Sequence, residues 1–257
     1  MLGSVAWEVR ALQASIPPLL HGRGSVPSRP GFRAGHGPNK VGCSCMKRTP
    51  LVVVLCAASC ALPMLSQTAH QHHPPESSAE YAKVLDDPAR DAWQKPHEVI
   101  LALKLTGNET VADIGSGTGY FANRLARHAR RVFAVDIDAR LLEISLKTAP
   151  GNVTPVLASP DDPRLPDGAS DVIFFCDVVH HIEGRAAYFE KVKRALKPGG
   201  RVVVIDFQKR KLDIGPPPEM KIDRAEMVKE FEQAGFRLTE EQGFLPYQYF
   251  VVFSPAS

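Results

Sequence analysis

The sequence predicts an α/β domain with a seven-stranded, mostly parallel sheet, helices on both faces and an antiparallel hairpin at its C-terminal end. Short, continuously apolar segments alternate with segments whose apolar residues recur at helical spacing, which is typical of buried parallel strands joined by helices. The last two apolar segments are too close in sequence for a crossover, so they should pair antiparallel. The expected strands are residues 110–114, 131–137, 153–157, 170–176, 201–207, 236–241 and 247–253.

Helical spacing marks the segments before and between these strands. Pro150 and Gly151 end the helix after the second strand, and the sequence "KPGG" at 197–200 ends the helix before the fifth. The three prolines at 216–218 are incompatible with a helix or a central strand, so residues 208–220 are expected to form a loop. The expected helices are residues 79–93, 95–105, 119–129, 139–149, 185–196 and 224–235.

The first 75 residues differ in composition from the rest, because Glu8 is their only acid. Residues 1–45, rich in Gly, Pro, Ser and Arg without a period, are expected to be a disordered leader or an over-extended start. From Met46 a basic start, an apolar run and a polar stretch have the layout of a signal peptide. We therefore interpret 46–78 as a signal-peptide-like segment with a polar linker, and 79–257 as the folded domain.

This leader predicts export, for example to a periplasm, from a start at Met46. A cytoplasmic or organellar location is the alternative, since a long, acid-poor leader with Arg and Ser is also typical of transit peptides. The apolar run is short for a membrane span, and no span is expected in the folded domain.

Composition also narrows the kinds of partner. A net charge of +3 over 257 residues, without a basic stripe, gives no sign of a nucleic-acid surface. Cys176 is the only cysteine after residue 60, so a disulfide framework is excluded from the domain. The cysteines and histidines of the leader lack the spacing of a zinc site, and no metal is expected. A small molecule remains the expected partner.

Ligands of open parallel sheets bind at the carboxyl ends of the strands, and the first strand is followed by the glycine-rich sequence "GSGTG". Glycine permits a tight turn and a close approach of the ligand to the backbone. A dinucleotide fingerprint would need a third glycine where Tyr120 stands, and the carboxylate of Asp113 would repel a pyrophosphate. The ligand is therefore expected to be zwitterionic or cationic, with Asp136 after the second strand accepting ribose hydroxyls. The glycines are Gly115, Gly117 and Gly119.

Four blocks in this order resemble class I S-adenosylmethionine-dependent methyltransferases of the small-molecule type: "VADIGSGTG", "VFAVDID", "SDVIFFCDVVHHI" and "ALKPGGRVVVIDF". The resemblance covers about residues 91–253 and implies a Rossmann-like fold with S-adenosylmethionine as cofactor. Where the family has an acid that meets the adenine amine, this sequence has Ser159, so Asp161 or Asp162 is expected to substitute. The cofactor-binding residues that the resemblance implies are Asp113, Gly115, Ser116, Gly117, Gly119, Asp136, Ile137, Asp161 and Asp177.

Methyl transfer from a sulfonium needs alignment and the exclusion of water, and it needs a base only if the acceptor must lose a proton. The candidates for catalytic groups follow the fourth strand: Asp177, His180 and His181. Residues 93–96 and 215–218, with Tyr247 and Tyr249, are expected to line the acceptor pocket. Two other functions stay open, a protein that binds S-adenosylmethionine without turning it over and a nicotinamide-dependent oxidoreductase.

Overall fold

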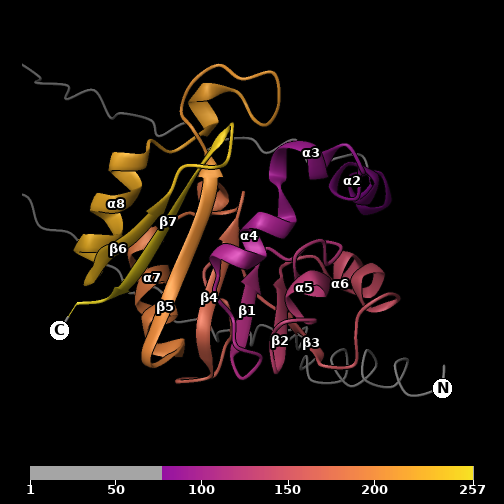
Figure 1. Cartoon of the computed structure of the whole chain (residues 1–257), viewed down its shortest axis with the longest axis horizontal. Coiled ribbons are helices and arrows are strands. Elements are labelled where there is room, and N and C mark those ends of the chain that lie inside the picture. Colours follow the sequence, from indigo (N-terminus) through magenta and orange to yellow (C-terminus); the bar gives the residue numbers. More distant parts are fainter. Residues whose placement is uncertain (1–76, 257) are drawn as a thin grey trace, which may run out of the picture. The chain divides into compact units, whose positions relative to one another are not determined.

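The computed structural model describes residues 77–256, and over this range the predicted fold class is confirmed. Seven strands form one sheet in the order β3-β2-β1-β4-β5-β7-β6 (Figure 1). The first five strands of the chain run parallel, while β7 pairs antiparallel with both β5 and β6. The strands are β1 Thr110–Ile114, β2 Arg131–Asp136, β3 Val153–Leu157, β4 Ser170–Cys176, β5 Leu196–Phe207, β6 Phe236–Gln242 and β7 Gln248–Pro255.

Helices cover both faces of the sheet and enclose a hydrophobic core on each side (Figure 1). One core packs α7 and α8 against the sheet through residues such as Phe189 and Phe231. The other packs α4, α5 and α6, and Leu125 is fully buried there. The helices are α2 Ser78–Leu85, α3 Arg90–Gln94, α4 Pro96–Ala102, α5 Ala122–Leu125, α6 Ala139–Leu146, α7 Arg185–Ala195 and α8 Arg224–Gln233.

Two helices differ from the prediction. The single helix expected over 79–93 is split into α2 and α3, because Pro88 cannot continue a helix and Asp87 instead accepts a hydrogen bond from the backbone of Ala89. The helix expected over 119–129 is only α5. It starts late because Gly119 has a φ of 89°, and beyond it His128 donates to the carbonyl of Leu125 in a tighter turn.

Two loop predictions were also wrong in detail. The helix before "KPGG" does end, at Ala195, but the segment lies within β5, which was expected to start only at residue 201. It forms an irregularity between the pairs Ser170–Leu196 and Val172–Arg201. The proline-rich loop contains a short 3-10 turn, Pro218–Met220, since proline is compatible with the first position of a helical turn.

The carboxyl ends of β1, β2, β4 and β5 lie at the same edge of the sheet, because these strands are parallel. Asp113 near the end of β1 is opposite Ala134 on one side and Phe174 on the other. Polar residues from segments far apart in sequence therefore meet at this edge, where ligands of open α/β sheets bind.

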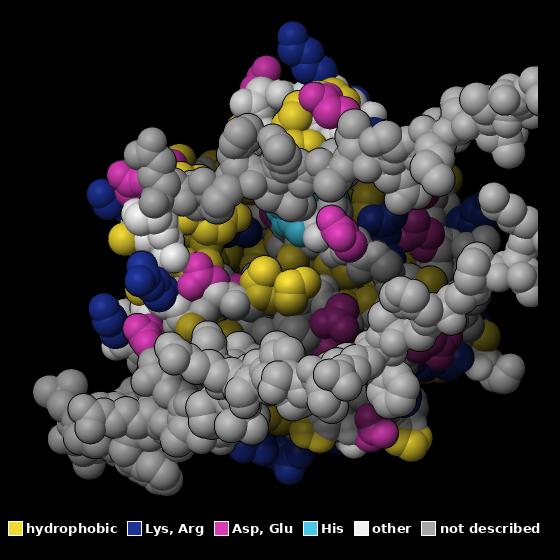
Figure 2. All heavy atoms as spheres, turned by 180° about the vertical axis from the view of Figure 1, so that it is seen from behind, with side chains coloured by type: hydrophobic (Ala, Val, Ile, Leu, Met, Phe, Trp, Pro, Cys, Tyr) yellow, Lys and Arg dark blue, Asp and Glu magenta, His cyan; other side chains and the backbone are white. Residues whose placement is uncertain are grey.

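Within residues 77–256, no helix is long and apolar enough to cross a membrane. On the face seen in Figure 2, Lys and Arg side chains are interspersed with Asp and Glu, and the visible part has no continuous basic stripe. The leader at 1–45 and the signal-peptide-like segment from Met46 to residue 76 lie outside the described residues.

Candidate functional site

The glycine loop after β1 is a tight turn in which side chains would not fit at the three glycine positions. Gly115, Gly117 and Gly119 have φ values of 71°, 54° and 89°, a region that other residues adopt only at a cost. A Cβ on Gly115 would lie 2.5 Å from Val178, and one on Gly119 would lie 2.4 Å from the hydroxyl of Ser145. The loop is therefore a close-fitting backbone cradle with its glycines at the positions that require them.

Asp113 lies beneath this loop with a side chain that is only 2% exposed. Its Oδ2 atom is buried and has no hydrogen-bond partner among the described residues. Burial, and secondarily the charge of Asp136, raises the pKa of Asp113 to about 8, although Arg90 opposes this shift. A buried oxygen without a partner is costly, and a ligand ammonium group would supply the missing hydrogen bond and charge.

Asp136, at the end of β2, faces the same loop. Its carboxylate accepts hydrogen bonds from the backbone N–H of Gly117, at 2.8 Å, and of Asp138, at 2.9 Å. Burial raises the pKa of Asp136 despite these hydrogen bonds. The next residue, Ile137, is 61% exposed, so its apolar side chain is accessible beside the loop.

Helix α2 and the turn after it lie over the glycine loop. The hydroxyl of Thr118 donates to Asp86 at 2.5 Å, and the hydroxyl of Ser78 donates to Asp138 at 2.8 Å. Leu85 is so close to Gly117 that a Cβ there would lie 2.9 Å from its methyl group. The N-terminal helix is thus attached to both cofactor-binding segments predicted from the sequence.

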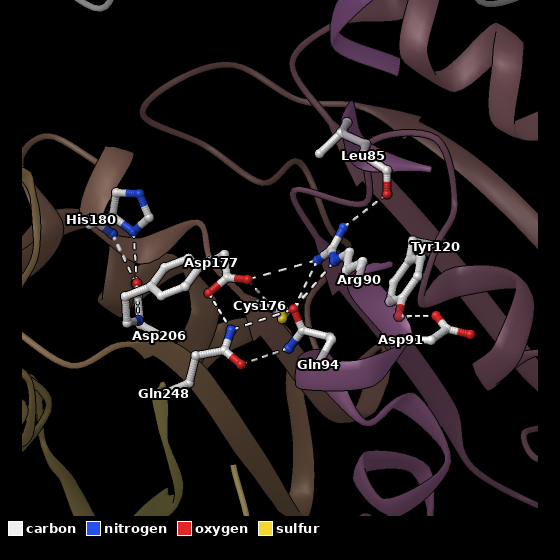
Figure 3. Close-up of polar contacts among 11 residues, drawn as sticks. Leu85, Arg90, Asp91, Gln94, Tyr120, Cys176, Asp177, His180, Asp206 and Gln248 are labelled. Atoms are coloured by element: carbon white, nitrogen blue, oxygen red, sulfur yellow. Dashed lines mark hydrogen bonds and ion pairs between the residues drawn. The ribbon is translucent and has the colours of Figure 1, made fainter. Parts of the chain in front are cut away.

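A buried polar network links α3 to the ends of β4 and β7 (Figure 3). The amide of Gln248 donates to Asp177 Oδ1 at 2.6 Å, and Gln94 Nε2 donates to Gln248 Oε1 at 3.0 Å. Arg90 donates to Gln94 Oε1 and lies 3.8 Å from Asp177 Oδ2. Gln94 is completely buried. Because every member has a partner, the network holds Arg90 and Asp177 in fixed positions.

Asp177 has a left-handed backbone, with φ of 57°, directly after β4. Burial and the charge of Asp206 raise the pKa of its carboxyl to about 6, while Arg90 and the hydrogen bond from Gln248 lower it. At neutral pH the Asp177 carboxyl is therefore mostly ionised, and its pKa is near enough to neutrality for the carboxylate to accept a proton.

The two predicted histidines lie in the short 3-10 turn Val179–His181, but their environments differ. The His180 ring is only 3% exposed, and its Nδ1 atom lies 2.8 Å from Asp206 Oδ1 (Figure 3). His181 is exposed, and its ring is tilted by 45° against that of His180, with ring centroids 4.0 Å apart. The structure therefore selects His180 as the oriented imidazole.

Asp161 is a predicted cofactor-binding residue that does not lie among the residues at the ends of β1, β2 and β4. Its side chain is 80% exposed, accepts a hydrogen bond from Ser159 at 2.9 Å and pairs with Lys191 of α7 at 3.4 Å. Lys191 also pairs with Asp162, at 3.3 Å. The carboxylates that were expected to replace the adenine-binding acid are thus held by a lysine of a neighbouring helix. The other predicted residues lie at the ends of β1, β2 and β4 or directly after them: Asp113, Gly115, Ser116, Gly117, Gly119, Asp136, Ile137, Asp177, His180 and His181.

Three residues of the site were missed from the sequence, whereas Gln94 had been expected to line the acceptor pocket and lies buried in this network. Asp206 is the penultimate residue of β5, so the rule that ligand-binding residues follow parallel strands could have found it. Arg90 and Gln248 carry no such signal, because one lies in a helical segment and the other begins an antiparallel strand.

The fold and the residues at its strand ends are similar to those of class I S-adenosylmethionine-dependent methyltransferases. Residues 112–204 match the family described as "Methyltransferase domain". A solved S-adenosylmethionine-dependent methyltransferase from Aquifex aeolicus superposes with a TM-score of 0.64 at 26% identity, and the match covers 70% of this chain and 98% of that one. The cofactor of this class is S-adenosylmethionine.

Two curated relatives show how far the sequence similarity extends. A probable S-adenosylmethionine-dependent methyltransferase of Mycolicibacterium smegmatis is 29% identical over 168 residues, which are 59% of this chain and 62% of that protein. Demethylmenaquinone methyltransferase of Tropheryma whipplei is 32% identical over 116 residues, 44% of this chain and 48% of that protein. The chain thus spans about half the length of these relatives.

Proposed function

We propose that this protein transfers a methyl group from S-adenosylmethionine to a small-molecule acceptor. The observation that carries the proposal is the orphaned, buried Oδ2 of Asp113 beside a loop whose three glycine positions have no room for a side chain. This combination suits a ligand with an ammonium group in close contact with the backbone. The nicotinamide alternative is disfavoured because Tyr120 stands where a dinucleotide fingerprint needs its third glycine.

The residues at the strand ends fit the parts of this cofactor. Asp113 would bind the ammonium, and Arg90, the cation nearest Asp177 in the buried network, would bind the carboxylate. Asp136 would accept the ribose hydroxyls, and the exposed Ile137 would pack on the adenine. When bound, the cofactor supplies an electrophilic methyl group on a sulfonium.

The protein's own task is then to align the acceptor, exclude water and take up any proton that the acceptor loses. His180 suits the last role, because Asp206 fixes its ring and leaves Nε2 as the proton acceptor when the ring is neutral. Asp177 lies at the end of β4 beside Arg90 and would stabilise the positive charge around the transferred methyl group. Exposed His181 would not act in this step.

Calorimetric titration tests the cofactor assignment. S-adenosylhomocysteine should bind the wild type, whereas NAD should not. Asp136→Asn should weaken binding about 10- to 100-fold, the range expected for losing hydrogen bonds to a charged group. Asp167→Asn, a change at an exposed acid outside the site, is the matched control. Equal affinity in the two variants would overturn the role of Asp136, and tight binding of NAD would overturn the class of ligand.

Two further points are proposals. Turnover is distinguished from binding alone by incubating the protein with methyl-labelled cofactor and a cell extract, since a protein that only binds the cofactor leaves all label on it.

Export remains a prediction, and N-terminal sequencing of the protein purified from its source would test whether the mature chain begins after residue 46.

A further inference from the structure

We propose that a polar cavity beside the cofactor site is the methyl-acceptor pocket, and that it takes a compact, polar acceptor carrying an anionic group. The inference rests on the proposed function and specifies its substrate class. The cavity lies at the carboxyl edge of the sheet, between the segment after β5, the β6–β7 connection and the start of α8. Its volume is about 330 Å³.

Gln248 connects this cavity to the reaction centre. It borders the cavity, and its side-chain amide donates to Asp177 Oδ1 at 2.6 Å. Asp177 in turn lies beside Arg90. An acceptor in the cavity is therefore separated from the end of β4 by a single side chain, whose movement would couple acceptor binding to the position of Asp177.

Tyr249 supplies an unused hydrogen-bonding group at the same place. It borders the cavity, is 5% exposed, and its hydroxyl has no hydrogen-bond partner among the described residues. Burial and the nearby carboxylates, Asp206 first, raise the pKa of Tyr249 well above its ordinary value, so the hydroxyl stays protonated. Buried hydroxyls are normally hydrogen-bonded, and a polar acceptor would complete this one.

The lining carries three cations, Lys209, Arg210 and Arg224, against two acids, Asp223 and Glu241, so the charges around the cavity favour an anion by a single net positive charge. Arg224 is paired with Glu241, and Lys209 lies 3.7 Å from Glu226. Arg210 donates only to neutral oxygens, to Gln208 Oε1 at 2.9 Å and to the Pro246 carbonyl at 3.3 Å, and it has no ion pair within residues 77–256. One guanidinium at the cavity is thus left for a ligand carboxylate or phosphate, which it can bind with two parallel hydrogen bonds.

The size and polarity of the lining also restrict the acceptor. About 330 Å³ is near the lower end of the range for ligand pockets. Most lining side chains are polar or charged, and Leu245 and Tyr249 are the bulky apolar contributions. These polar side chains suit an acceptor that carries polar groups of its own, and the volume suits a compact one.

Labelling with a cell extract tests the inference. The full chain is incubated with tritiated-methyl S-adenosylmethionine and a protein-free extract of its source cells, and the product is partitioned between hexane and water. The aqueous phase is then passed over an anion exchanger. We expect label in the aqueous, anion-retained fraction. Arg210→Gln should raise KM for that fraction at least 10-fold, with affinity for S-adenosylhomocysteine unchanged. Lys211→Gln, one residue along the same loop and outside the lining, is the matched control.

The outcomes separate this inference from the proposed function. A labelled product that enters hexane, or one that passes the anion exchanger, overturns the acceptor class while methyl transfer stands. Equal KM for Arg210→Gln and Lys211→Gln overturns the role of the cavity. Binding of S-adenosylhomocysteine without any labelled product overturns the proposed transfer itself, and the acceptor pocket with it. Tyr249→Phe should lower the affinity for the same fraction and gives a second measure of contact with the cavity.

Discussion

The imidazole of His180 and the carboxylate of Asp206 form a buried pair, with 2.8 Å between Nδ1 and Oδ1, although they are 26 residues apart in sequence. A carboxylate accepts hydrogen bonds, so Nδ1 carries the hydrogen and Nε2 is the basic atom of the neutral ring. Asp206 also accepts a hydrogen bond from the backbone N–H of Phe207, which fixes the carboxylate in turn. The geometry therefore determines the tautomer as well as the orientation of the ring.

Replacing Asp206 by Asn should lower the pKa of His180. Burial by itself lowers that pKa, but the hydrogen bond and charge of Asp206, helped by Asp177, outweigh burial and raise it above 6.5. The resonances of the His180 ring, followed by NMR through a pH titration, measure the shift directly. Asp213→Asn, at an exposed loop position, is the control and should leave the titration unchanged. An equal pKa in wild type and Asp206→Asn would contradict the pairing.

The same pair should make stability depend on pH. Because the folded-state pKa of His180 is raised, its contribution is fully present below about pH 6.5 and is lost as pH rises through the folded pKa. The difference in free energy of unfolding between wild type and Asp206→Asn should therefore be larger at pH 5.5 than at pH 8.5. Urea denaturation at the two pH values measures it, and a difference that grows with pH would contradict the sign.

Binding of S-adenosylhomocysteine should release a proton from Asp113. With a pKa of about 8 in the free protein, this carboxyl is mostly protonated at pH 7, whereas a ligand ammonium favours the ionised form. Calorimetry at pH 7 in buffers of different ionisation enthalpy should report release of about one proton per site. Affinity should increase as pH rises toward 8. Uptake of protons, or no linkage, would contradict the ammonium contact.

The same linkage predicts opposite effects of Asp113→Asn on stability and on binding. A folded pKa above the unfolded value means that the free protein loses stability as pH rises from about 4 to 8. The Asn variant should lack this loss and be more stable than wild type at pH 8, by on the order of 1 kcal/mol or more. It should also bind S-adenosylhomocysteine weakly. Thermal unfolding at pH 5 and pH 8, with and without ligand, separates the two effects.

Arg90→Gln should weaken binding of S-adenosylhomocysteine but not of 5′-methylthioadenosine, which lacks the amino-acid end. Arg90 lies beside Asp177 and is held by Gln94, so it is placed to bind a carboxylate. Losing a charged hydrogen bond corresponds to about a 10- to 100-fold change in Kd. Lys83→Gln, an exposed change on α2, is the control. An equal loss of affinity for both ligands would mean that Arg90 supports the fold of the pocket and does not contact the ligand.

The strands and strand-end residues were predictable because their signals are local. β1, β3 and β4 have the predicted bounds, since each is a short apolar run bounded by polar or turn-forming residues. Parallel pairing then brings residues such as Asp113, Asp136 and Asp177 to one edge without further information. Helix lengths were less predictable, because the early part of the segment expected as one helix over 119–129 is committed to the glycine loop.

The buried hydrogen bonds behind the strand-end residues were not predictable, for a physical reason. Gln94 and Gln248 are 154 residues apart, and each reads as an ordinary polar residue in its own segment. These two side chains are buried only because α3 packs over the edge of the sheet in the folded protein. The same holds for Asp161, whose exposure is set by its ion pair with Lys191 on α7. Polar residues that satisfy one another across the fold carry no periodic signal.

Substitution of Gly115 should be costly, while an equivalent substitution at Gly151 should not. Gly115 has φ of 71°, and an added Cβ would lie 2.5 Å from Val178; at Gly151 nothing lies within 4 Å of the added atom. Gly115→Ala combines backbone strain of about 1 kcal/mol with overpacking of about 1–3 kcal/mol. Gly151→Ala should be neutral or slightly stabilising, because it restricts the unfolded chain. Urea denaturation of both variants compares the free energies of unfolding.

A double variant separates the two costs at Gly115. Val178→Ala, combined with Gly115→Ala, removes the methyl groups that the new Cβ would meet and leaves the positive φ unchanged. Part of the overpacking loss should therefore be recovered, although the Cβ of residue 178 would still lie 2.9 Å from the new atom. The backbone part of about 1 kcal/mol should persist. If Val178→Ala recovers nothing, the loss arises from the backbone alone, and the close contact with Val178 is not what requires glycine there.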